Sequence, residues 1–154
     1  MNLGQLEAAI DNDDKALAIK PNYHLAWNNR GNAFLDLGRF KEATDSYDKA
    51  LAIKPDHCVA LDNRGIVLMK LGRLEEAIAS CDKALEFDPD DDAAWYNKAC
   101  CYALDSNVDL AIENLQQAIK SNPEEYPEMA RIDTDFETIR GDKRFKALIQ
   151  GGNE

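Results

Sequence analysis

The segment Asp14-Lys-Ala-Leu-Ala-Ile-Lys-Pro21 recurs unchanged at residues 48–55, which is 34 positions further along the chain. A third, modified copy, Asp82-Lys-Ala-Leu-Glu-Phe-Asp-Pro89, follows at the same step. Three series of single residues share this period: Pro21, Pro55, Pro89 and Pro123; Ala9, Ala43, Ala77 and Ala111; Ala16, Ala50, Ala84 and Ala118. A fixed period of this length is typical of proteins built from stacked helical repeats.

Each repeat unit predicts two helices joined by a short turn. In the second unit, Trp27, Gly31 and Phe34 lie on one face of a helix. Gly38 follows at a turn, where a helix end can accept a left-handed residue. A second apolar stripe ends just before Pro55, because the residue that precedes proline is disfavoured in the α region. One such hairpin cannot bury its apolar face alone, so the units are expected to stack.

This pattern resembles that of the tetratricopeptide repeat family. The first-helix signature of the family is matched by three sets of residues: Trp27, Gly31 and Phe34; Leu61, Gly65 and Leu68; Trp95, Ala99 and Tyr102. The second-helix signature is matched by Ala43, Tyr47, Ala50 and Pro55 and by their equivalents. The resemblance covers residues 1–123 and implies an all-α, right-handed α-solenoid of helix-turn-helix repeats.

Two departures from the family pattern concern detail. Arg30, Arg64 and Lys98 stand where leucine is usual, and we expect their aliphatic stems to pack while their charges reach water. Asp105-Ser106 replaces the Leu-Gly turn in the last unit, so we expect a looser turn there.

We expect a single domain over residues 1–154. Its predicted parts are a half repeat at 1–23, full repeats at 24–57, 58–91 and 92–125, and C-terminal capping helices at 126–154.

The half repeat opens at the turn, because Leu3-Gly4-Gln5-Leu6 aligns with residues 37–40. Two explanations stay open: the chain is a fragment of a longer array, or the half repeat is a native start with a solvated edge. Under either, we expect Leu6, Ile10 and Leu17 to be partly exposed and to favour self-association.

The period is lost after Pro123, where apolar residues are spaced for short amphipathic helices. Asp133-Thr-Asp-Phe136, Ile139-Arg140 and Arg144-Phe145 are similar to a C-terminal element often found after bacterial tetratricopeptide arrays. A terminal repeat needs a cover with a polar outer side, so we expect this segment to act as a cap. A docking role for the basic stretch is the alternative; its residues are Lys143, Arg144 and Lys146.

Composition narrows the classes of partner. The chain has 154 residues, with 29 acidic against 18 basic residues and a formal charge of −11. Such a protein is repelled by phosphate backbones and anionic membranes, so we expect neither nucleic-acid nor membrane binding. No apolar run approaches the length of a membrane span, and the N-terminus lacks a signal-peptide pattern. Four cysteines in 154 residues are too few for a disulfide framework, which predicts a reduced, cytoplasmic protein.

No arrangement of residues predicts catalysis, a metal site or a cofactor. His24 and His57 are expected at the surface near helix starts. The acidic run at 88–92 does not form an EF-hand, because Ala93 and Ala99 stand where glycine and glutamate are required. We interpret the four cysteines as small apolar fillers; they are Cys58, Cys81, Cys100 and Cys101.

The family resemblance implies a peptide-binding groove along the first helices. Its expected residues are Asn28, Asn29, Asn32, Asp62, Asn63, Ile66, Met69, Tyr96, Asn97 and Cys100. Asn29, Asn63 and Asn97 recur at one position of each full repeat, and a carboxamide can both donate to and accept from a peptide backbone. The alternative is that these asparagines only cap or bridge neighbouring helices.

A clamp for the acidic C-terminal tails of chaperones is rejected. Asn32 and Asn63 match two of its positions, but the cations expected at Asn28, Ala93 and Asn97 are missing. We therefore predict a non-catalytic scaffold that binds a protein or peptide in its concave groove. The alternative is a self-assembly module that uses its terminal repeats to form a homo-oligomer.

Overall fold

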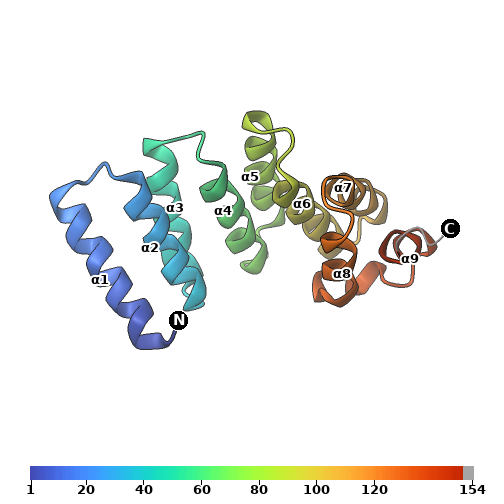
Figure 1. Cartoon of the computed structure of the whole chain (residues 1–154), viewed down its shortest axis with the longest axis horizontal. Coiled ribbons are helices and arrows are strands. Elements are labelled where there is room, and N and C mark those ends of the chain that lie inside the picture. The colour runs from blue at the N-terminus through green and yellow to red at the C-terminus, as the bar shows by residue number, and fades with distance from the viewer. Residues whose placement is uncertain (151–154) are drawn as a thin grey trace.

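Successive helices pack against one another in pairs from one end of the molecule to the other (Figure 1). The computed structural model describes residues 1–150 and contains no strand among them. The elements are α1 (Leu3–Ile19), α2 (His24–Asp36), α3 (Phe40–Ile53), α4 (Cys58–Lys70), α5 (Leu74–Phe87), α6 (Asp92–Leu104), α7 (Val108–Ser121), α8 (Glu125–Ile132), the 3-10 helix η1 (Thr134–Ile139) and α9 (Lys143–Ile149). The all-α solenoid predicted from the sequence is confirmed.

Small residues on each first helix face large ones on the second. A Cβ atom on Gly31 in α2 would lie 2.6 Å from Cε1 of Tyr47 in α3, whose ring is fully buried. On Gly65 in α4 it would lie 3.1 Å from Sγ of Cys81 in α5. The 34-residue period of the sequence therefore corresponds to a repeated packing contact, in which a glycine of the first helix leaves space for a side chain of the second helix.

The same charged pair joins each first helix to the helix before it. Arg30 Nε donates to Asp14 Oδ1 (2.7 Å) and Arg64 Nε donates to Asp48 Oδ1 (2.6 Å). Lys98 Nζ pairs with Asp82 Oδ1 at 2.6 Å. The aspartate of each pair is the first residue of the repeated eight-residue segment. The basic residues that replace leucine thus bind acidic partners of the preceding repeat as well as reaching water.

The last turn has the same geometry as the others, so the prediction of a looser turn is wrong. Gly38 and Gly72 adopt positive φ values of 71° and 74°, and Ser106 adopts 59°. Ser106 N donates to Ala103 O (3.0 Å), as Gly38 N does to Leu35 O (2.9 Å). The backbone hydrogen bonds hold the turn even though serine is strained in the left-handed region.

At the N-terminal end, α1 is held by its cap and by α2. Asn2 and Gln5 form reciprocal backbone–side-chain hydrogen bonds of 3.0 Å around the first turn. Leu6 and Leu17 are only 5% and 7% exposed, so the prediction that they are partly exposed is wrong for these two residues, whereas Ile10 is partly exposed as predicted. The apolar side of α1 that carries these two residues faces α2. Contact with α2 is enough to bury them, although no helix precedes α1 among the described residues.

The C-terminal elements fold back against α6 and α7 instead of only extending the array (Figure 1). Phe136 of η1 is fully buried, with ring centroids 5.7 Å from Tyr96 and 5.4 Å from Phe145. Thr138 Oγ1 donates to Ala103 O at 2.7 Å. This segment therefore covers part of α6 that a longer array would leave for the next repeat.

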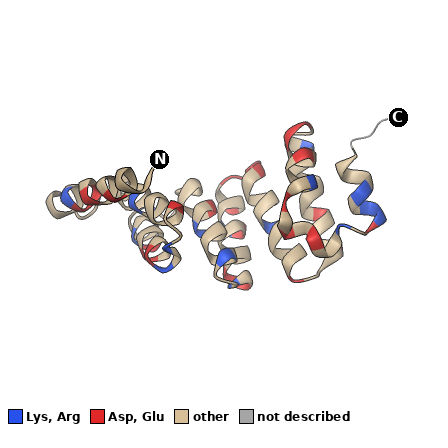
Figure 2. Cartoon of the chain, turned by 90° about the horizontal axis from the view of Figure 1, so that it is seen from below, with Lys and Arg blue, Asp and Glu red and all other residues tan. Residues whose placement is uncertain are grey.

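Basic residues gather on α9 near the C-terminus, whereas acidic residues are spread along the array (Figure 2). Arg144, in the basic stretch, pairs with Asp109 of α7 at 2.7 Å and with Asp142 at 3.1 Å. Among residues 1–150, no helix is both long enough and apolar enough to span a bilayer.

Candidate functional site

The inner face of the array is formed by the first helices of the repeats. α2 packs against α4 and α4 against α6, so these helices lie on the more closely spaced side of the stack. They carry all of the predicted groove residues. α2 supplies Asn28, Asn29 and Asn32; α4 supplies Asp62, Asn63, Ile66 and Met69; α6 supplies Tyr96, Asn97 and Cys100.

Burial of the predicted asparagine series rises toward the C-terminal end. Asn29 is exposed, Asn63 is half-buried and Asn97 is buried. Among the described residues, Asn63 is the member of the series with a side-chain hydrogen bond: its Nδ2 donates to Asn32 Oδ1 at 3.0 Å. Asn32 Oδ1 also accepts from the hydroxyl of Tyr47 at 2.7 Å. Asn63 thus bridges two helices while its Oδ1 and second amide hydrogen stay available.

A concave pocket of about 280 Å³ lies between α4, α6 and α8. Its walls are Val59, Asp62, Asn63, Ile66, Ala93, Tyr96, Asn97, Tyr126 and Met129. Five of these residues are in the predicted groove set. Tyr126 and Met129 were not predicted, because the segment after Pro123 was assigned a capping role, with docking by its basic stretch as the alternative. The apolar spacing of that segment, which starts in the register of a further repeat, was the signal for an additional inner helix.

Two of the predicted residues are covered by the C-terminal segment. Cys100 is 1% exposed, so the prediction that it faces an open groove is wrong. Tyr96 is also buried: its ring stacks on Tyr126 with centroids 5.1 Å apart, and its hydroxyl donates to Asp133 Oδ2 at 2.9 Å. Tyr96 still forms part of the pocket wall, but its ring is covered by Tyr126 and does not face an open groove.

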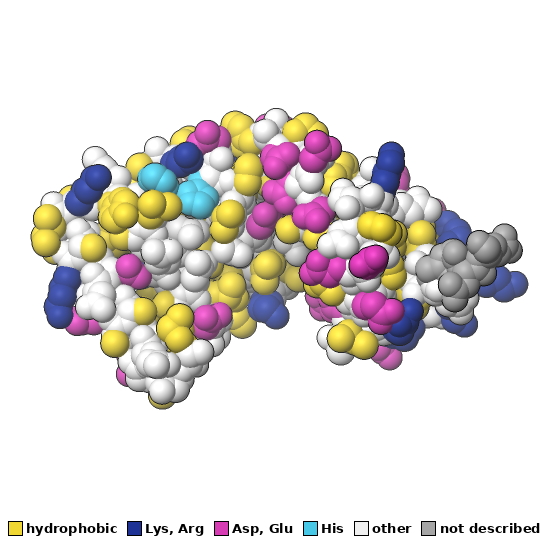
Figure 3. All heavy atoms as spheres, in the orientation of Figure 1, with side chains coloured by type: hydrophobic (Ala, Val, Ile, Leu, Met, Phe, Trp, Pro, Cys, Tyr) yellow, Lys and Arg dark blue, Asp and Glu magenta, His cyan; other side chains and the backbone are white. Residues whose placement is uncertain are grey.

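Carboxyl groups gather at one side of this pocket. Asp62 lies in the wall with its Oδ1 buried and without a hydrogen-bond partner. Burial, followed by the charge of Asp91 and a hydrogen bond with its carboxyl group, raises the pKa of Asp62 to about 8; Asp92 and Asp88 act in the same direction. Figure 3 shows acidic side chains around the start of α6, beside hydrophobic ones. Such a wall repels carboxylates and attracts cations.

A second pocket, of about 370 Å³, lies between α1 and α2. It includes Asn29 and Asn32 of the predicted set and Asp13 of α1. Asp13 occupies the position that Tyr47 holds in the next repeat. Burial and the neighbouring Asp14 raise the pKa of Asp13, and Arg30 lowers it in part.

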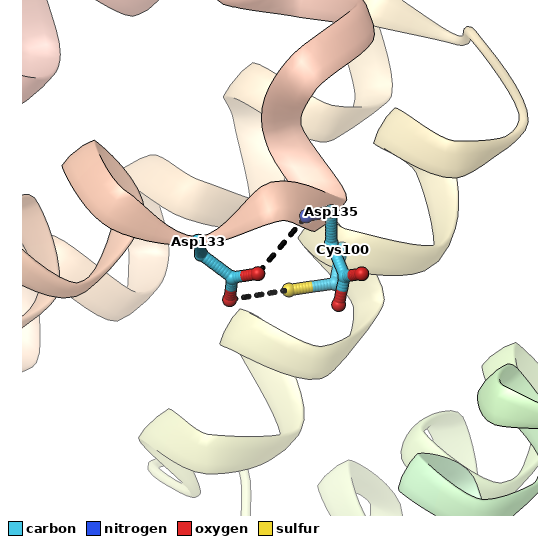
Figure 4. A group of neighbouring side chains, drawn as sticks. All are labelled: Cys100, Asp133 and Asp135. Carbon is cyan, nitrogen blue, oxygen red and sulfur yellow. Dashed lines mark hydrogen bonds between the residues drawn. The ribbon is translucent and has the colours of Figure 1, made fainter.

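Cys100, Asp133 and Asp135 bring their sulfur and carboxylate atoms within 4.8 Å of one another (Figure 4). Hydrogen bonds account for this cluster. Asp133 Oδ1 accepts from Asp135 N (3.0 Å), and its Oδ2 accepts from the Cys100 thiol (3.9 Å). Burial raises the pKa of Cys100 well above its ordinary value, so the thiol keeps its proton. The cluster caps η1 and fastens it to α6.

The two histidines lie together outside the first two pockets. Their ring centroids are 5.5 Å apart in an edge-to-face arrangement. Nδ1 of His57 accepts from Ala60 N at 3.3 Å and caps α4. Burial, and then the proximity of His24, lowers the pKa of His57.

Family models and solved structures agree on the architecture. Two models described as Tetratricopeptide repeat match residues 24–57 with 63–91, and residues 80–113; a model described as TPR repeat matches residues 1–38. No curated protein matches the sequence.

Three solved structures illustrate the likeness. MamA 41-end from Desulfovibrio magneticus RS-1 is 25% identical, with a TM-score of 0.76 over 96% of this chain and 85% of that one. YrrB, described as a TPR protein with an unusual peptide-binding site, is 22% identical, with a TM-score of 0.73 over 97% and 77%. The first TPR of Spaghetti (RPAP3), bound to the HSP90 peptide SRMEEVD, is 16% identical, with a TM-score of 0.66 over 82% and 90%.

Proposed function

The chain belongs to the tetratricopeptide repeat family, and from this premise we propose that it is a non-catalytic scaffold that binds a peptide segment of another protein. The segment lies along the inner face and enters the pocket between α4, α6 and α8.

The pocket itself is the observation that carries the proposal. Its walls are mostly apolar, with side chains such as Ile66 and Met129, while the amides of Asn63 and Asn97 add a few polar groups. Binding sites for peptides and small ligands combine apolar walls with a few such groups in this way. An asparagine side chain can pair with a peptide backbone whatever the peptide's own side chains are.

The structural neighbours support a peptide ligand. The groove residues of the present chain argue against a ligand as acidic as the one bound by RPAP3. YrrB has a peptide-binding site, and the RPAP3 repeat binds a peptide whose last four residues include three acids. In the present chain Asp62 lies in the pocket, and Asn28, Ala93 and Asn97 replace the cations that would hold an acidic tail. An acidic peptide is therefore a poor ligand for this groove.

The chemistry of the groove supports a non-catalytic role. Among the described residues that line the pocket between α4, α6 and α8 there is no histidine, cysteine, serine or lysine. Its phenols are Tyr96 and Tyr126, and burial raises the pKa of both, so they stay protonated. Asp62 is the remaining titratable group, and no serine or cysteine of residues 1–150 lines the pocket beside it, so we propose that the pocket binds a ligand without activating a nucleophile.

Self-assembly is the second candidate function. The pocket between α1 and α2 lies at the open end of the array, and Leu3 and Ile19 of α1 are exposed there. A helix of a second copy packed on this end would bury part of the apolar surface exposed there. Sedimentation at several protein concentrations distinguishes the two functions: a concentration-dependent dimer that Leu3→Glu abolishes supports assembly, whereas a monomer throughout contradicts it.

Site-specific photo-crosslinking tests the proposed function. A benzoyl-phenylalanine probe replaces Val59, which is 56% exposed at the pocket, or Phe87, which is 48% exposed at the end of α5. Each variant is incubated with a random peptide library. Peptides crosslinked at Val59 but not at Phe87 support binding in the groove. Equal yields at both positions, or none at Val59 in a protein with unchanged circular dichroism, contradict it.

A further inference from the structure

The pocket between α4, α6 and α8 combines apolar walls with a carboxyl group that has no counter-charge. None of the described residues that line it is basic. Asp62 Oδ1 is buried there without a hydrogen-bond partner, and Asp91 and Asp92 approach it from the start of α6. The described residues of the pocket offer this carboxyl group no positive charge, so its ionised form is unfavourable in the free protein and the arrangement favours a cation that enters from outside.

Asp62, Asp91 and Asp92 are specific to the junction between the repeats at 58–91 and 92–125, and the repeat pattern does not include them. The position of Asp62 is occupied by Asn28 one repeat earlier and by Tyr96 one repeat later. Asp91 and Asp92 correspond to His57 and Cys58 at the preceding junction. Stacking of the repeats therefore does not require these acids, because the neighbouring junction packs without them.

Resting on the proposed function, we propose that this pocket binds one lysine or arginine side chain of an extended segment of the partner protein. The aliphatic stem lies against the apolar walls, which include Ile66 and Met129, and the charged head reaches Asp62 and Asp91. Long basic side chains bury their stems on apolar surface while their heads find charge. Asn63 and Asn97 are placed to hold the peptide backbone on either side.

Binding of the cation is coupled to loss of a proton. With its pKa at about 8, the carboxyl of Asp62 is mostly protonated at neutral pH in the free protein. The groups that act on it are Asp91 and Asp92 of α6 and Asp88 before it; the thiols of Cys58 in α4 and Cys81 in α5 also lie within its field. A bound cation favours the carboxylate, so affinity for a basic peptide rises between pH 6 and pH 8.

A positional-scanning peptide library tests the proposal, with one central position fixed as each amino acid in turn and the rest mixed. Norleucine and citrulline serve as neutral analogues of lysine and arginine. We expect the lysine and arginine pools to bind at least about tenfold tighter than the neutral pools, as measured by fluorescence anisotropy. The preference should grow from pH 6 to pH 8.

Two variants with the same change in net charge separate the pocket from the general field of an acidic protein. Asp62→Asn reproduces the residue found at the equivalent position, Asn28, so we expect the variant to fold, and circular dichroism checks this. Asp90→Asn removes an exposed acid that does not line the pocket. We expect Asp62→Asn to abolish the basic preference and Asp90→Asn to keep it.

The outcomes distinguish this inference from the proposed function. Peptides that crosslink at Val59 with no basic preference, or with a preference unchanged by Asp62→Asn, overturn the inference and leave peptide binding in place. Absence of any crosslink at Val59 overturns both.

Discussion

At the scale of single residues, Gly31 shows how closely the helices of one repeat approach. A Cβ at this position would lie 2.6 Å from the ring of Tyr47, and that ring is fixed by burial and by the hydrogen bond from its hydroxyl to Asn32. At the equivalent Gly65 the nearest atom is Sγ of Cys81, at 3.1 Å. A side chain at this glycine position therefore clashes severely in one repeat and is more easily accommodated in the next.

We expect Gly31→Ala to destabilise the fold by about 1–2 kcal/mol, since overpacking outweighs the gain in helix propensity. Gly65→Ala is the matched control and should cost clearly less, because a thiol shifts more easily than a hydrogen-bonded ring. Urea unfolding followed by circular dichroism measures both. A larger loss for Gly65→Ala would contradict this account of the packing.

Ser106 is a residue held in a strained conformation by its turn. Its φ of 59° suits glycine, which occupies the same position in the two preceding repeats. Ser106→Gly should therefore stabilise the protein by about 0.5–1 kcal/mol. The reverse change, Gly38→Ser, should destabilise it by a similar amount, because nothing lies within 4 Å of a Cβ at Gly38 to add a clash. Thermal melting of both variants checks the two opposite signs.

Asp62 makes stability depend on pH. Its pKa is raised from 3.8 to about 8 in the folded protein, so the folded state binds this proton more tightly than the unfolded state does. The stability associated with the proton is complete below pH 4 and is lost as the pH rises toward 8. Asp62→Asn should therefore be more stable than wild type at pH 8, by on the order of 1 kcal/mol after allowing for solvent screening, with a smaller difference at pH 4. Urea unfolding at both pH values measures the difference, and a difference independent of pH would refute this assignment.

At the scale of helices, the array follows directly from the 34-residue period, whereas the place of the C-terminal segment does not. The turn at Gly38 and the stop before Pro55 are local signals, and the helices end where these residues predict. The contact of Phe136 with Tyr96 joins residues 40 positions apart and depends on tertiary packing. The repeat pattern therefore predicted that Asn63 and Ile66 lie at the candidate site. It did not predict that the C-terminal segment buries Cys100 or that Met129 lines the pocket, because both depend on tertiary packing.

Phe136 is the fully buried side chain that holds the C-terminal segment in place. Phe136→Ala removes a fully buried ring and should cost about 3–5 kcal/mol of local or global stability. If the segment loosens, Cys100 becomes accessible, so alkylation of this thiol, followed by peptide mass spectrometry, should be faster in the variant. Thr138→Val, which removes only the hydrogen bond to Ala103 O, should cost about 1 kcal/mol and serves as the control. Unchanged alkylation of Cys100 in a destabilised Phe136→Ala would show that the segment does not cover α6.

At the scale of the whole molecule, ion pairs between neighbouring repeats attract, while the excess of acidic residues repels. The ion pair that joins each repeat to the one before is formed three times, by Arg30, Arg64 and Lys98 with their aspartates. Each pair keeps an exposed aspartate, and pairs of this kind contribute little, about 0–1 kcal/mol. Against them stands a formal charge of −11, distributed along the length of the stack (Figure 2).

Repulsion should prevail, because the chain has 29 acidic residues and only 18 basic ones. Raising NaCl from about 10 to about 150 mM shortens the screening length to near 8 Å and weakens both effects, the repulsion more because it acts over longer distances. The melting temperature should therefore rise over this range. The triple variant Arg30→Met, Arg64→Met and Lys98→Met loses three positive charges from a chain of formal charge −11, so a rise at least as large as that of the wild type would show that the salt effect comes from the overall charge. A fall in the wild-type melting temperature, absent from the triple variant, would show instead that the ion pairs between repeats dominate.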